Sequence, residues 1–139
     1  MPVVLNPSTV VVEFDEHYRH ELDSINFLRS GKEWYGEPFG TQNGKLSSRD
    51  FNLNLSGAIQ GSDFTLHSEE VGRSFEQPNR MQVLLNGHSL FEHSTPPMVG
   101  TLLEPAANVS RKTGKGKITG NGLVVGYRLN AGSATAEAW

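Results

Sequence analysis

The chain has 139 residues, of which 36% are hydrophobic, enough to fill one core without help from metals or disulfides. Its formal net charge of -3 is too close to balance to indicate a nucleic-acid or anionic-membrane partner through the overall field. It has no cysteine, which excludes disulfide scaffolds, thiolate zinc sites and cysteine nucleophiles within these residues. We predict a single domain over residues 1–139 and no transmembrane segment, because no apolar run reaches about 18 residues.

The predicted elements are short strands. Residues 9–14 are β-branched and aromatic and follow a proline-containing segment, so they predict a first strand. Residues 17–23 are polar and predict an exposed or edge strand. In residues 51–55 apolar side chains alternate with asparagines, which predicts the clearest half-buried strand. Further strands are predicted at residues 64–67, 80–85, 90–91, 99–103 and 123–129, with turn and exposed strand over residues 110–122.

A hairpin is predicted at Asn86-Gly87, which apolar runs flank on both sides. A type I′ turn needs positive φ at both central residues, and Asn followed by Gly is the sequence that best allows it. A two-residue loop also fixes the register of the two strands. The predicted cross-strand pairs are Leu85 with His88 and Val83 with Leu90.

The fold class follows from the number and spacing of these strands. No window of helical length shows an apolar stripe at the helical period, and about eight or nine short strands follow one another at near-regular spacing. We predict an all-β protein, an antiparallel β-sandwich of jelly-roll-like or immunoglobulin-like type.

An aromatic corner is predicted at Trp34 and Tyr35, which lie between Gly31 and Gly36 and shortly before a proline. Such a stretch fits neither a helix interior nor a plain strand, and its glycines allow a tight turn that lays the rings against a sheet. One interpretation is a sugar-stacking platform, as in glycan-binding sandwiches. The other is a buried plug at one end of the sandwich, which the glycines and the nearby Phe39 favour.

Four basic residues, Arg111, Lys112, Lys115 and Lys117, lie among glycines. Their spacing does not match a phosphate-binding loop, because neither Lys115 nor Lys117 is followed by a hydroxyl residue. Charge runs are usually solvated, so the prediction is a solvated hairpin tip, with a patch for an anionic partner as the alternative.

The sequence contains few of the motifs that indicate a metal site or a catalytic site. Residues 15–21 contain two histidines and three carboxylates, but on a strand His17 and His20 point to opposite faces, so a charged edge is predicted instead. A calcium site built from carboxylates of separate loops stays open. There is no Gly-x-Ser-x-Gly elbow. We predict no catalytic residue, no metal and no cofactor.

The wording of several segments resembles a known family. The Ser-Gly-Lys-Glu-Trp-Tyr-Gly-Glu stretch at residues 30–37, the Arg-His-Glu-Leu run before it, and residues 51–55 and 83–87 resemble a domain of the PorU-type sortases. These are the C-terminal signal peptidases of the type IX secretion system of Bacteroidota. The similar part is the non-catalytic β domain that precedes their gingipain-like cysteine peptidase domain.

The resemblance implies a fragment of a larger exported protein, located in the periplasm, in the outer membrane or at the cell surface of a Gram-negative bacterium. The peptidase nucleophile and base would lie beyond this chain, and a further strand is expected to begin at Trp139 and continue toward them. The implied role is a structural or docking module. The implied partners are the adjacent peptidase domain, secreted proteins with C-terminal signal domains and anionic lipopolysaccharide, with no nucleic acid.

Two other functions compete with this role. The runner-up is an independent glycan-binding module of a secreted or surface protein, with Trp34 and Tyr35 as its contact site. The third is an adhesin repeat, against which the absence of internal self-similarity speaks.

Overall fold

The computed structural model describes residues 36–42, 44–55, 57–101, 104, 107–120, 122–131 and 136–139. These residues form eight strands: β1 (Phe39–Gly40), β2 (Ser48–Asn54), β3 (Asp63–Arg73), β4 (Asn79–Leu85), β5 (His88–Thr95), β6 (Asn108–Lys117), β7 (Gly122–Ala131) and β8 (Glu137–Ala138). Among them there is no helix long and apolar enough to cross a membrane. The strands predicted at residues 9–14 and 17–23, the charged edge at 15–21 and the aromatic corner lie outside the described residues.

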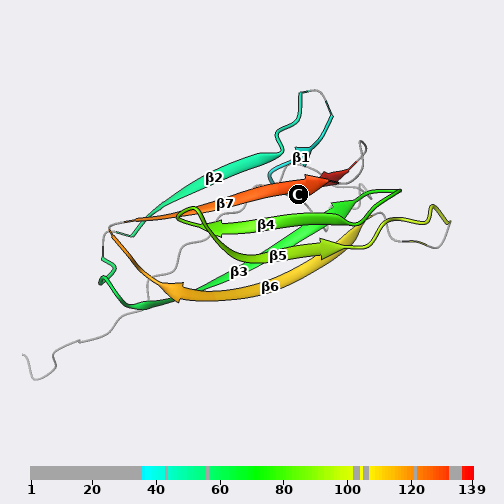
Figure 1. Cartoon of the computed structure of the whole chain (residues 1–139). Coiled ribbons are helices and arrows are strands. Elements are labelled where there is room, and N and C mark those ends of the chain that lie inside the picture. Colours follow the sequence, from blue (N-terminus) through cyan, green and yellow to red (C-terminus); the bar gives the residue numbers. More distant parts are fainter. Residues whose placement is uncertain are drawn as a thin grey trace, which may run out of the picture.

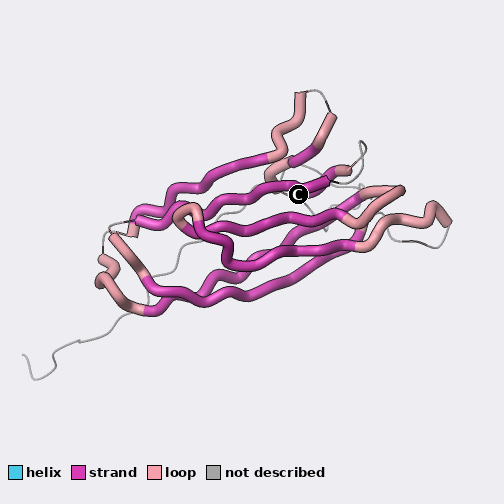
Figure 2. The backbone as a smooth tube through the Cα atoms, in the orientation of Figure 1, coloured by secondary structure: helices cyan, strands magenta, loops and turns pink. Residues whose placement is uncertain are grey.

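The strands form two four-stranded antiparallel sheets, ordered β1-β8-β3-β6 and β2-β7-β4-β5. They pack face to face as a sandwich, which confirms the predicted fold class (Figure 1; Figure 2). The edge strands β5 and β6 run side by side along one margin (Figure 1). At the opposite margin Arg49 of β2 reaches toward β1, where it donates to the Pro38 carbonyl and pairs with Glu37.

The predicted alternation of buried and exposed residues is confirmed. On β2 the apolar Phe51 and Leu53 are partly buried, whereas Asn52 and Asn54 are exposed. The strands predicted at residues 51–55, 64–67, 80–85, 90–91 and 123–129 are present as β2, β3, β4, β5 and β7, each longer than predicted. The segment predicted as turn and exposed strand contains most of β6.

The β4–β5 hairpin turns at Asn86 and Gly87, whose φ angles of 48° and 84° are both positive, as predicted. Leu85 pairs with His88, also as predicted. The second predicted pair is wrong, because Val83 pairs with Phe91 instead of Leu90. A β-bulge between Val83 and Leu84 adds one residue to β5, and such a residue switches every later side chain to the other face.

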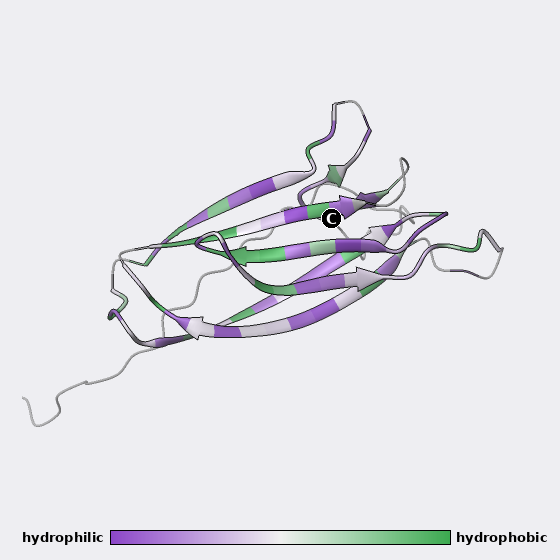
Figure 3. Cartoon of the chain, viewed as in Figure 1, coloured by the Kyte–Doolittle hydropathy of each residue, from purple (hydrophilic) through white to green (hydrophobic). Residues whose placement is uncertain are grey.

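This bulge decides what β5 contributes to the interior. Beyond it His93 and Thr95 are buried and Glu92 is exposed, whereas the predicted register would have turned Glu92 inward. The Phe91 and His93 rings meet edge to face, with centroids 5.4 Å apart. On the partner strand β4 the hydrophobic residues gather toward the hairpin turn, and the opposite end is polar (Figure 3).

The strand predicted at residues 99–103 is wrong for its described part. Val99, Gly100 and Thr101 form no strand, and Gly100 has a φ of 81°, outside the extended range. The N–H groups of Val99 and Gly100 instead donate to the Glu104 carboxylate at 2.6–2.9 Å. These bonds connect Glu104 to Val99 and Gly100, and the Val99 side chain is largely exposed.

A cluster of buried apolar residues lies where β1 and β8 face β4 and β7. Phe39, Met81, Leu129 and Ala138 form this apolar cluster, and Tyr127 packs against it. The Tyr127 ring also meets Phe51 edge to face at 5.8 Å. Burial of these side chains is the main driving force that holds the two sheets together here.

Candidate functional site

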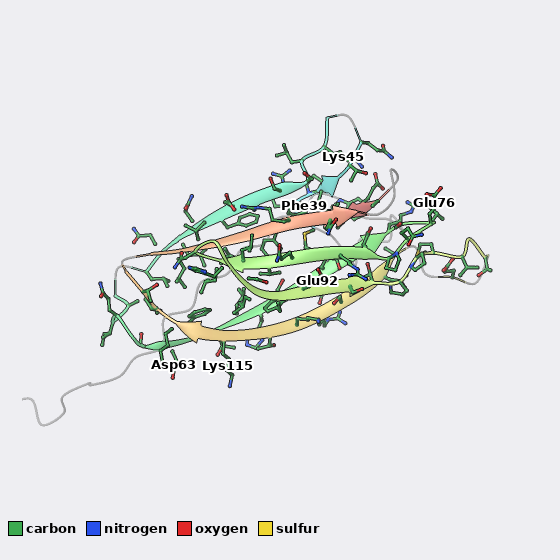
Figure 4. All side chains as sticks on the ribbon, viewed as in Figure 1. Phe39, Lys45, Asp63, Glu76, Glu92 and Lys115 are labelled. Atoms are coloured by element: carbon green, nitrogen blue, oxygen red, sulfur yellow. The ribbon has the colours of Figure 1, made fainter. Side chains whose placement is uncertain are left out.

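The four predicted basic residues all lie on β6, so they do not form a hairpin tip. Because side chains alternate along a strand, Arg111, Lys115 and Lys117 occupy one face and Lys112 the other. The first three share the outer face of the β3–β6 pair, and Lys115 projects away from the sandwich (Figure 4). Lys112 stands opposite Ser68, whose side chain is buried.

Acidic residues of β3 neutralise much of this outer face. Arg111 pairs with Glu69, and Lys117 pairs with Asp63 at 2.8 Å. The hydrogen bond and charge of Lys117 lower the pKa of the Asp63 carboxyl. In the part of the chain that the structure describes, Lys115 makes no ion pair. A site for an anionic partner stays a prediction, and on this face it depends mainly on Lys115.

Trp34 and Tyr35 lie outside the described residues. Both the buried plug and the sugar-stacking platform therefore stay predictions. On the strands themselves, the described aromatic rings of Phe51, Phe64, Phe91 and Tyr127 all lie on inward-facing positions.

A chain of hydrogen-bonded side chains crosses the interior between the two sheets. The Tyr127 hydroxyl bonds to Ser68 Oγ at 2.9 Å, Ser68 Oγ bonds to His93 Nε2 at 2.9 Å, and His93 Nδ1 bonds to Ser110 Oγ at 2.9 Å. This His93 chain takes one member each from β7, β3, β5 and β6. It joins both sheets through polar contacts within the sandwich interior.

Burial, and to a lesser degree the positive charge of Lys112, lower the pKa of His93 to about 4. The imidazole is therefore neutral at pH 7, with one ring nitrogen as donor and the other as acceptor between two serine hydroxyls. An imidazole beside a serine is the pairing that activates a nucleophile in hydrolases. Here His93 is 0% exposed, and its hydrogen bonds to Ser68 and Ser110 connect β5 to β3 and β6.

A second polar group lies beside this chain, at Gly72 of β3. Glu70, Asn79 and Thr95 are each at most 2% exposed, and a Cβ placed on Gly72 would overlap with Thr95 Oγ1. That same point lies 3.0 Å from both Asn79 Nδ2 and Glu70 Oε1. We call these three residues around Gly72 the Glu70 cluster.

The Glu70 cluster contains oxygen atoms without hydrogen-bond partners: both carboxyl oxygens of Glu70, Asn79 Oδ1 and Thr95 Oγ1. Burial raises the pKa of the Glu70 carboxyl to about 7. Among the described residues, no group of three or more His, Cys, Asp or Glu side chains lies close enough to hold a metal ion. At pH 7 the buried Glu70 carboxyl is therefore close to its pKa.

Sequence reasoning missed both polar groups. The predicted strand at residues 90–91 stopped before His93 and Thr95, so neither was considered as an interior residue. The alternation of Phe91, His93 and Thr95 carries a signal for burial, but it becomes readable only with the bulge in place.

No protein-family model and no curated protein sequence matches the chain. A solved structure does match, that of dimeric latent PorU from Porphyromonas gingivalis, with a TM-score of 0.67. The chain has the fold of a portion of PorU. The match covers 86% of this chain and 12% of PorU at 16% identity. At this identity the likeness establishes the fold alone, and it agrees with the sequence resemblance only in the fold.

Proposed function

We propose that the chain is a non-catalytic structural and docking module of a PorU-type sortase, the C-terminal signal peptidase of the type IX secretion system. The observation that carries the proposal is the fold it shares with part of PorU over 86% of its length. The independent resemblance of residues 30–37 to the domain before the peptidase points the same way.

The chemistry of the chain supports a non-catalytic role. Its sequence has no cysteine, so these residues do not supply the nucleophile of a cysteine peptidase. The imidazole of His93 is hydrogen-bonded to two serines inside the sandwich and is 0% exposed. In this role the module is exported, sits beside the peptidase domain and helps present the C-terminal signal domains of secreted proteins.

The test measures binding and turnover together. The 139-residue chain is mixed with the gingipain-like peptidase domain of a PorU-type sortase from the same organism, and complex formation is followed by light scattering after size exclusion. We expect a one-to-one complex. We also expect no cleavage of a C-terminal signal substrate by the chain alone.

An unrelated β-sandwich of similar size serves as the control for non-specific association. Failure of the chain to bind the peptidase domain above this control would overturn the docking role. Turnover by the purified chain alone would overturn its non-catalytic character. Binding to a glycan array, lost in Trp34→Ala with folding intact, would replace the proposal with the glycan-binding function.

A further inference from the structure

Among the described residues, Glu70 has no hydrogen-bond or ion-pair partner that would stabilise a charge on its buried carboxyl group. Neither carboxyl oxygen has a hydrogen-bond partner, and the residue is 2% exposed. Its neighbours Asn79 and Thr95 present further unpartnered oxygens, Asn79 Oδ1 and Thr95 Oγ1, which repel a carboxylate. The protons that these neighbours could still donate are that of the Thr95 hydroxyl and the second N–H of the Asn79 amide, whose other N–H donates to the Glu137 carbonyl. An ionised Glu70 therefore needs water, and a protonated Glu70 does not.

The titratable groups on the surrounding elements do not offset this charge. On β5 His93 is neutral and bonded to Ser68 and Ser110, and on β7 the Tyr127 hydroxyl bonds to Ser68. Glu137 of β8 pairs with Lys45. Lys112 of β6 is exposed, and Arg73 of β3 lies one residue from the inward-facing Gly72, with its guanidinium over the Phe75 ring. None of these groups forms an ion pair with Glu70.

Strand β8 is the element that closes the sandwich over the Glu70 cluster. It has two residues, and Ala138 pairs with Gly72 itself. The Asn79 amide donates to the Glu137 carbonyl at 2.6 Å, and Val71 and Trp139 exchange two backbone hydrogen bonds of 2.9 Å. A strand of two residues is a short element whose local opening would admit water to Glu70 without unfolding the longer strands.

We propose that Glu70 is a proton-controlled latch for β8. While the carboxyl is protonated, β8 stays docked between β1 and β3; when the carboxyl ionises, β8 detaches before the rest of the sandwich opens. The direction follows from linkage: a group whose pKa is about 7 in the folded protein and 4.5 in an unstructured chain favours the closed form at low pH and loses this effect as pH rises toward 7. The full loss corresponds to about 300-fold in the closing equilibrium.

Amide hydrogen exchange of the 139-residue chain, followed by NMR and corrected for intrinsic exchange rates, tests the latch. Between about pH 5.5 and about pH 8.5 we expect protection of the Val71 and Trp139 amides to fall by about 30-fold, the part of the full effect that lies in this range, while the amides of β4 and β7 change far less. Glu70→Gln, which is neutral at every pH, should keep the protection constant. Glu69→Gln, the exposed neighbour, should behave as the wild type does.

Two results would overturn the latch: constant protection of Val71 and Trp139 in the wild type, or an equal fall in Glu70→Gln. The ¹³C shift of the Glu70 carboxyl in the labelled wild-type chain gives a readout that needs no variant. A carboxyl already ionised at about pH 5.5 would also refute the proposal, because the latch requires it to be protonated there.

Discussion

The apolar cluster and the Glu70 cluster lie in the same interior but are held together in different ways. Phe39, Met81 and Leu129 contribute burial of apolar surface, which does not depend on the charge state of any residue. The Glu70 cluster is equally buried, yet its stability depends on one proton and on the fit of side chains around a glycine. The sandwich thus contains one region whose stability is independent of pH and one, the Glu70 cluster, whose stability depends on the protonation of Glu70.

Met81→Ala should give the largest effect, because Met81 is 1% exposed within the apolar cluster. Removing a buried side chain of this size costs transfer free energy and leaves a cavity. We expect a loss of about 2–5 kcal/mol in the free energy of unfolding, measured by urea denaturation. Leu46→Ala, at a residue that is 55% exposed, should change it by less than about 0.5 kcal/mol. A Met81 variant as stable as the Leu46 variant would contradict a core at this site.

The second prediction concerns pH, because Glu70 and His93 titrate in opposite senses. The raised pKa of Glu70 makes stability fall as pH rises from 4.5 to about 7. The lowered pKa of His93 makes stability rise as pH increases from about 4 to 6.5. Over the shared range the two slopes cancel, so the wild type should show little pH dependence from these groups.

Single variants should reveal the hidden slopes. In Glu70→Gln only the His93 effect remains, so the free energy of unfolding of this variant should rise by about 3 kcal/mol from pH 4 to 6.5. In His93→Gln only the Glu70 effect remains, so the free energy of unfolding of this variant should fall by about 3 kcal/mol from pH 4.5 to about 7. Urea denaturation at a series of pH values measures both. Parallel curves for the wild type and either variant would show that the corresponding group is not buried as described.

How much the sequence predicted differs between the two regions. The strands that carry the apolar cluster follow from alternation, and the hairpin follows from Asn86-Gly87. The contribution of β5 to the polar interior was not predictable, because a single inserted residue in that strand turns His93 and Thr95 inward. Local propensity contains no information on which residue a bulge adds. The contacts of Arg111 and Lys117 likewise depend on the register of β3, a strand distant in sequence.

Gly72→Ala should disturb the packing of the Glu70 cluster directly. The new methyl group would overlap with Thr95 Oγ1 and lie 3.0 Å from Asn79 Nδ2, in a site where every neighbour is buried. Overpacking of this kind costs about 1–3 kcal/mol, to be measured by thermal denaturation. Gly116→Ala is the matched change on β6, where the methyl group would overlap with the Phe64 ring, the end of a side chain that can move, and make an ordinary contact with Leu85 Cδ2 at 3.7 Å. Equal losses in the two variants would show that the space around Gly72 is not special.

The smallest effect is expected on the outer face, where charge and not burial joins β3 to β6. Glu69→Gln removes the partner of Arg111, whose side chain is 72% exposed, and water replaces the lost contact. Exposed ion pairs contribute about 0.2–1 kcal/mol, and salt screens them. We therefore expect a loss below about 1 kcal/mol at low salt, which disappears in urea denaturation at about 1 M salt. Arg111→Gln combined with Glu69→Gln should cost no more than either change alone, because the second change removes a charge that is already unpaired. A loss that persists at high salt would mean that Glu69 supports the fold in some other way than through its charge. The contrast between the buried Glu70 cluster, which affects stability strongly, and the outer face, which affects it weakly, would then be wrong.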